Sequence, residues 1–231
     1  IFTDIALFFH RTGDYTFLLN RGITQQTIDR FKLGSTKQFE TNSYELEEFI
    51  FNLKQKYIKD LIEYAFLDYH LFMFETNLRL YKDPYCVTIP TFDNNGICRG
   101  IVYRTEKYYP RTDSIRNLYK FYNSHAPSYI FNLEAVYEYD TLLLVEGVFD
   151  ALSIYQLGFE NVISVSHTKL SKYHIELLKD KNIIMLTDND MGGLSGLEYF
   201  YEHYHNSVKS IKYYQLKLDK DIDLFIRNKP E

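Results

Sequence analysis

The 231-residue sequence has no tryptophan, only two cysteines and only five prolines. Cys86 and Cys98 are twelve residues apart and have no nearby third partner, so no zinc site can be built from them and we expect a reducing, cytosolic setting. No apolar run approaches the ~18–20 residues that would cross a bilayer, which excludes a transmembrane helix. No basic flank precedes the apolar start Ile1–Arg11, so we expect no signal peptide.

The sequence also lacks a strong excess of positive or negative side chains. Lys and Arg number 26 and Asp and Glu 31, which gives a net charge of −5. Hydrophobic residues make up 45% of the chain and aromatic residues 17%, which excludes a disordered chain and provides for a sizeable core. Taken alone, the negative balance argues against a nucleic-acid partner, because such proteins usually carry a basic surface.

Residues 1–83 have a helical pattern. Ile23, Ile28 and Phe31 follow Gly22, with Thr24 as the expected N-cap and Gly34 as the expected stop. A longer amphipathic helix is predicted from Tyr44, because its apolar residues recur every three or four positions. The polar face of that helix is not predominantly basic, which favours packing on a core over binding to a membrane surface.

Residues 84–139 change to strand and turn. Val87–Phe92 and Ile97–Arg104 predict a β-hairpin, with Asn95-Gly96 in its turn. A basic segment follows, Arg99–Lys120, with six basic residues against two acidic ones. Its tyrosines are better candidates for stacking on bases than the tyrosines at helical spacing, which more often fill a core.

Residues 140–231 alternate between strands and helices. Strands are expected at Leu142–Val145, Val162–Val165, Ile183–Leu186 and Ile211–Leu216, with helices at Phe149–Leu157, Tyr173–Leu178 and Leu194–Tyr204. Continuous apolar strands separated by helices predict an α/β fold with a parallel sheet covered on both faces. Ligands of such sheets gather at the carboxyl ends of the strands.

Carboxylates follow three of these four strands. They are Glu146 and Asp150 after the first, Asp188 and Asp190 after the third, and Asp221 and Asp223 after the fourth. Oxygen-only ligands favour Mg²⁺ or Mn²⁺ over Zn²⁺, as in phosphoryl-transfer sites. Gly192 and Gly193 open the following helix and could offer backbone N–H groups to a phosphate. Each carboxylate alone could equally be a helix N-cap.

Several motifs resemble one family. LLLVEGVFD (Leu142–Asp150), LTDNDMGG (Leu186–Gly193) and KDIDLFI (Lys220–Ile226) resemble the Toprim domain of topoisomerases and primases. LLNRGITQQTIDRFKLG (Leu18–Gly34), IPTFDNNGICRGIVYR (Ile89–Arg104) and KFYNS (Lys120–Ser124) resemble the catalytic core of bacterial and phage replicative DNA primases. The resemblance implies a Rossmann-like Toprim domain at 140–231, preceded by a mixed α+β subdomain made of 1–83 and 84–139.

The resemblance also implies roles for these residues. Glu146, Asp188 and Asp190 would be catalytic and hold Mg²⁺ or Mn²⁺, Asp221 and Asp223 would support a further metal, and Asp150 would help order the site. Arg104 and Lys120 would contact template or nucleotide phosphates, within the basic segment that also holds Arg99, Arg111 and Arg116. The reaction would be RNA primer synthesis from ribonucleoside triphosphates on single-stranded DNA, in a bacterial or phage-infected cytoplasm and with a replicative helicase or another replisome protein as partner.

Two other functions stay open at this point. A metal-dependent nuclease would keep the fold and change the chemistry, and a non-catalytic nucleic-acid or replisome-binding module would need no carboxylate cluster. The zinc-binding module typical of these primases is absent from the sequence. The net charge itself no longer argues against DNA, because five of the predicted ligands account for the whole −5 and the basic segment supplies +4.

Overall fold

The computed structural model describes most of the chain. The described residues are 1–36, 44–57, 86–105, 122–123, 130–165, 172–188, 191–215 and 222–228. They form two compact units: Ile1–Arg21, Ile28–Pro90 and Gly100–His125 in the first, and Gly22–Thr27, Thr91–Arg99 and Ala126–Glu231 in the second. The three-part division at 83 and 139 that the sequence indicates stays a prediction.

The first unit begins with short helices. They are α1 (Phe2–Thr12), α2 (Thr16–Asn20) and α3 (Gln25–Phe31), followed by strand β1 (Gly34–Ser35) and helix α4 (Tyr44–Lys56). α1 packs against α4, where the rings of Phe8 and Phe49 stack 3.9 Å apart. Lys56 Nζ donates to Asp4 Oδ2 over 2.7 Å at the exposed side of the same contact. The helix predicted from Tyr44 is thus confirmed as far as Lys56, and residues 58–85 lie outside the described part.

The start and the end of α3 differ in how well the sequence predicts them. Thr24 Oγ1 accepts the N–H of Thr27 over 3.3 Å, so the predicted N-cap is confirmed. The predicted stop at Gly34 is wrong, because α3 ends at Phe31 and Lys32 takes the positive φ of 51°. Gly34 belongs to β1, where a Cβ would lie 2.7 Å from the backbone of Phe9 in α1.

A sheet follows, in the order β1-β2-β3-β4. β2 (Cys86–Phe92) and β3 (Cys98–Thr105) form the predicted hairpin, and β4 (Tyr122–Asn123) pairs antiparallel with β3. Gly96 has a φ of 73°, as a turn glycine requires, and Asn95 does not share it. Asp93 closes the turn instead, since its Oδ1 accepts the N–H groups of Asn95 and Ile97.

The second unit contains the predicted parallel sheet. Its strands are β5 (Thr141–Val145), β6 (Val162–Ser164), β7 (Asn182–Thr187) and β8 (Ser210–Gln215), and the helices between them are α8 (Val148–Gln156), α9 (Lys172–Leu178) and α10 (Met191–Tyr204). The spatial order is β6-β5-β7-β8 and all three pairings are parallel, which confirms the α/β fold class. Two further helices, α7 (Leu133–Glu138) and α11 (Ile222–Arg227), were not expected from the sequence.

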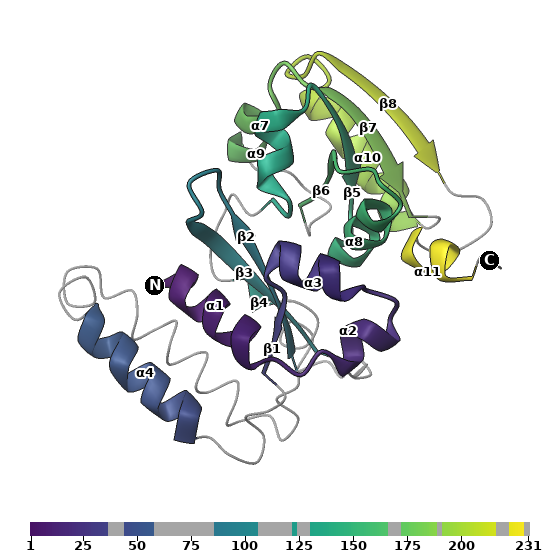
Figure 1. Cartoon of the computed structure of the whole chain (residues 1–231). Helices are drawn as coiled ribbons and strands as arrows, with labels where there is room; N and C mark the ends of the chain where they lie inside the picture. Colours follow the sequence, from purple (N-terminus) through teal and green to yellow (C-terminus); the bar gives the residue numbers. More distant parts are fainter. Residues whose placement is uncertain are drawn as a thin grey trace, which may run out of the picture. The chain divides into compact units, whose positions relative to one another are not determined.

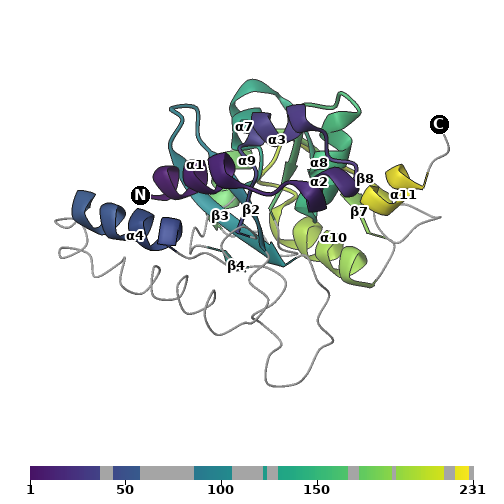
Figure 2. The same cartoon turned by 60° about the horizontal axis from the view of Figure 1, so that its bottom comes forward.

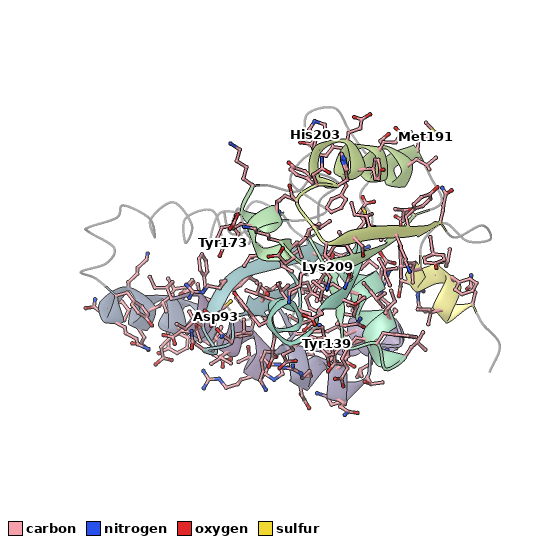
Figure 3. The ribbon with its side chains drawn as sticks, turned by 90° about the horizontal axis from the view of Figure 1, so that it is seen from above. Asp93, Tyr139, Tyr173, Met191, His203 and Lys209 are labelled. Carbon is pink, nitrogen blue, oxygen red and sulfur yellow. The ribbon has the colours of Figure 1, made fainter. Side chains whose placement is uncertain are left out.

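Helices cover both faces of this sheet (Figures 1 and 2). One face packs on α7, α9 and α10, with Leu142, Leu144, Ile183 and Phe200 in the buried core between them. α8 lies on the other face, and α11 lies beside it. Met191 and His203 mark the first and last turns of α10 in Figure 3. Among the described helices, none is long and apolar enough to cross a lipid bilayer.

Candidate metal and phosphate site

Two predicted metal ligands lie at neighbouring strand ends of the parallel sheet. Glu146 directly follows β5 and Asp188 directly follows β7, and the register pairs Val145 with Leu186. Both carboxylates are partly exposed. Because adjacent parallel strands end at the same edge of a sheet, these two side chains share the edge where ligands of α/β proteins bind.

Gly193 lets the first turn of α10 approach Asp188 closely. A Cβ at residue 193 would lie 2.5 Å from the carbonyl oxygen of Asp188 and 3.0 Å from its nitrogen. No side chain fits such a contact, so glycine is required for this approach and not for an unusual φ. The predicted glycines, Gly192 and Gly193, are thereby located in the first turn of a helix that starts three residues after Asp188.

Gly147 plays a similar part after β5. A Cβ on Gly147 would overlap the carboxylate of Asp150, which is 6% exposed. The missing side chain therefore lets Asp150 turn back towards the strand end. Ser164 in β6 donates its hydroxyl to the carbonyl oxygen of Glu146 over 2.8 Å, which fixes the backbone at the same point.

The carboxylates of Asp150 and Asp223 are committed to contacts within the protein. Asp150 Oδ1 accepts the backbone N–H of Asp223 over 2.8 Å. Asp223 Oδ1 accepts the hydroxyl of Ser153 over 2.8 Å, and Asp223 Oδ2 lies 3.0 Å from Nη2 of Arg227 and 3.1 Å from its Nε. Asp223 is 1% exposed, so these contacts join α11 to α8 through a buried network.

The metal site as a whole is only partly described. Asp190 and Asp221 lie outside the described residues, and so do the basic residues Arg111, Arg116 and Lys120. Within the described ranges, no three His, Cys, Asp or Glu side chains are grouped so that they could share an ion. Glu146 and Asp188 nevertheless fit Mg²⁺ or Mn²⁺ by their chemistry, because both are oxygen donors at one edge. The set of ligands stays a prediction.

Of the residues predicted to bind phosphate, the structure describes Arg99 and Arg104. Arg99 pairs with Asp93, whose Oδ2 lies 2.6 Å from Nη2 and 2.7 Å from Nε of the guanidinium. Burial alone would raise the pKa of Asp93, but hydrogen bonds from Ile97, Arg99 and Asn95 outweigh it and hold the pKa below its ordinary value.

Arg99 therefore stabilises the hairpin turn at Asp93, which is labelled in Figure 3. About half of its side chain stays exposed. Arg104 lies on β3 and is partly buried. Phosphate binding by either arginine stays a prediction.

Comparison with known proteins gives a consistent result. Residues 143–226 match the family model described as Toprim-like. The DNA primase of Buchnera aphidicola is 28% identical over 254 residues, which cover 97% of this chain and 39% of the relative. The chain is thus similar to DNA primases over nearly its whole length. Its resemblance to Toprim-type primase cores is thereby confirmed.

Solved primase structures agree with the fold. The Aquifex aeolicus primase, comprising zinc-binding and RNA polymerase domains, matches with a TM-score of 0.63 and 23% identity, over 97% of this chain and 56% of that one. A primase catalytic domain bound to single-stranded DNA matches with a TM-score of 0.55 and 19% identity, over 91% and 66% of the two chains. The chain spans 39% of the length of the Buchnera primase, and 37% and 19% of the DNA primases of Clostridium acetobutylicum and Campylobacter jejuni.

Several residues of this primase-like core have contacts that sequence reasoning missed. Arg227 follows Asp223 by four residues on a helix, a spacing that favours an ion pair, and Asp93 precedes an Asn-Asn-Gly turn. Both signals are present in the sequence. Ser153 gave no such signal, because nothing local indicates that α11 returns to α8.

Proposed function

We propose that this chain is the RNA-synthesising core of a DNA primase, which joins ribonucleotides on a single-stranded DNA template. The observation that carries the proposal is the position of Glu146 and Asp188 at adjacent strand ends of a Toprim-like sheet, in a chain with a primase-core fold. A mere binding surface for DNA gains nothing from carboxylates placed together. A nuclease would use the same carboxylates, but the likeness to primases extends over 97% of the chain.

The reaction needs an attack by the 3′-hydroxyl of one nucleotide on the α-phosphate of the next. Glu146, Asp188 and Asp190 would hold a divalent ion, and Asp221 would support a second, whereas the contacts of Asp223 with Ser153 and Arg227 leave its carboxylate a positioning role. The bound ions would activate the attacking hydroxyl and neutralise charge that develops on the phosphate. We propose Mg²⁺ or Mn²⁺ on the basis of the all-oxygen ligand set.

The chain's own groups would position the substrates. Gly192 and Gly193 lie in the first turn of α10, where the helix dipole would favour a phosphate. Arg104 and Lys120, with Arg99, Arg111 and Arg116, would contact phosphates of template and nucleotide. Asp150 would order the site through its hydrogen bond to the backbone of Asp223. We further propose a replicative helicase or another replisome protein as partner.

The test is a primer-synthesis assay on the full chain with single-stranded DNA, labelled ribonucleotides and Mg²⁺ or Mn²⁺. Short RNA products are expected. Asp188→Ala should lower the rate at least about 100-fold, because a metal ion contributes several kcal/mol and each 1.36 kcal/mol is tenfold in rate. Glu198→Ala is the matched control, since it removes an exposed carboxylate from α10 without touching the strand ends.

Three other outcomes would argue against the proposal. Shortened DNA that depends on Asp188 would indicate a nuclease. DNA binding without any product, with both metals, would indicate a binding module. Equal activity of the Asp188→Ala and wild-type chains would place the chemistry elsewhere.

A further inference from the structure

The acidic segment at the end of the chain contains a carboxylate that is fully occupied by protein groups. Asp223 lies in the first turn of α11, and its side chain is turned towards α8. Oδ1 accepts a hydrogen bond from Ser153, and Oδ2 accepts two from Arg227. At 2% side-chain exposure, neither oxygen is accessible to an ion or to a substrate phosphate.

This environment differs from that of the two described carboxylates at the strand ends. Glu146 and Asp188 are partly exposed at the strand ends, as a ligand that shares an ion with substrate must be. The carboxylate of Asp223 is neutralised by a guanidinium that forms an i,i+4 pair within α11. A buried ion pair with further hydrogen bonds is satisfied without a metal.

The backbone of Asp223 extends the same connection towards the strand end. Its N–H donates to Asp150, and Asp150 lies against Gly147 directly after Glu146. A series of direct contacts therefore runs from the end of β5 through α8 to the first turn of α11. α11 and α8 lie side by side in Figure 1.

We infer that Ser153, Asp223 and Arg227 form a clamp that holds α11 on α8, and that Asp223 is a positioning residue and not a metal ligand. Asp150 accepts the backbone N–H of Asp223 and lies against Gly147, next to Glu146, so the clamp acts on the proposed metal site through this contact. The inference rests on the proposed function for the existence of the metal site. The clamp itself rests only on the described contacts.

The test compares Asp223→Asn with Arg227→Met in the full chain, by thermal unfolding and by calorimetric titration with Mn²⁺. A clamp predicts that each substitution lowers Tm by roughly 3–10 °C, because each removes charged hydrogen bonds. The double variant should unfold no earlier than the worse single variant, since both residues act through one interaction. Both single variants should weaken Mn²⁺ binding by the same factor, roughly tenfold, as the loss of residues that orient metal ligands does.

A ligand role predicts a different pattern. Arg227→Met leaves the Asp223 carboxylate in place and frees it for an ion, so Mn²⁺ would bind as tightly as before or more tightly, while Asp223→Asn would weaken it. That pattern would overturn the inference, as would an unchanged Tm in both variants. Ser153→Ala removes one hydrogen bond and should lower Tm by less, which keeps the test decisive if the other variants do not fold.

Asp188→Asn separates this inference from the proposed function. It should weaken Mn²⁺ binding without lowering Tm, because Asp188 is outside the clamp. If Asp188→Asn leaves Mn²⁺ binding unchanged while Asp223→Asn and Arg227→Met both lower Tm, the proposed metal site fails and the clamp stands.

Discussion

Replacing Gly193 with alanine would disturb the site without removing any polar group. The added Cβ would lie 2.5 Å from the carbonyl oxygen of Asp188, which is 0.9 Å short of the 3.4 Å where ordinary contact begins. The obstructing atom belongs to the backbone and cannot rotate away. Either α10 or the segment at Asp188 must therefore move by close to 1 Å.

A displacement of that size has a large expected effect on the proposed reaction. A misplacement of 1 Å in an oriented site can cost about 100-fold in rate, so we expect Gly193→Ala to lower primer synthesis by roughly that factor. Stability supplies a second measurement with its own sign. Glycine to alanine in an unstrained helix stabilises by about 1 kcal/mol, whereas the contact with Asp188 should cancel that gain or reverse it.

The assay is the initial rate of RNA synthesis, measured together with Tm. Ser195→Ala is the control, because it changes an exposed side chain of the same helix without adding an atom near Asp188, and it should leave the rate unchanged. A Gly193→Ala protein with full activity and a raised Tm would refute the reasoning, since it would mean that α10 does not approach Asp188 as closely as the structure describes.

Three further predictions follow from the described contacts. Gly147→Ala should lower Tm, measured by calorimetry, because its Cβ would overlap the buried carboxylate of Asp150, and an unchanged Tm would contradict that contact. Asp93→Asn should lower the free energy of unfolding at pH 7 by about 1–3 kcal/mol. Because the pKa of Asp93 is lowered on folding, that difference should be present above the ordinary pKa and fade in urea titrations as the pH falls below it, and a pH-independent difference would contradict the assignment. Burial, with the Asp29 carboxylate, raises the pKa of Tyr15 to about 12, so its contribution to stability should be complete below its ordinary pKa of 10.0 and be lost as the pH rises through 12. An absorbance titration compared with Tyr15→Phe should show this tyrosine ionising near pH 12, and ionisation near pH 10 would refute the assignment.

The sequence by itself determined the architecture of the second unit. β5, β6 and β7 are largely apolar runs separated by helices of suitable length, and such a pattern has few solutions other than a parallel sheet with helices on both faces. The positions of Glu146 and Asp188 followed from the same pattern, because a side chain that directly follows a strand must lie at its carboxyl end. The N-cap of α3 and the β2–β3 hairpin were predictable for an equally local reason.

Other features were decided by contacts between distant segments. A glycine at position 34 is typical of a helix end, but the neighbours of Gly34 in space are Phe9 and Thr88. These contacts make it a strand residue. Arg99 is a predicted phosphate ligand, yet the hairpin turn brings its guanidinium to Asp93, only six residues earlier.

Asp223 is the clearest case. As a sequence position it is one more acid in an acidic motif, while in the structure it is a buried group satisfied by Ser153, 70 residues earlier, and by Arg227. Strand and helix periodicity is local and can be seen in a sequence. The contact of Ser153 with Asp223 depends on α11 returning to α8, and such a meeting of distant surfaces is settled only in the folded chain.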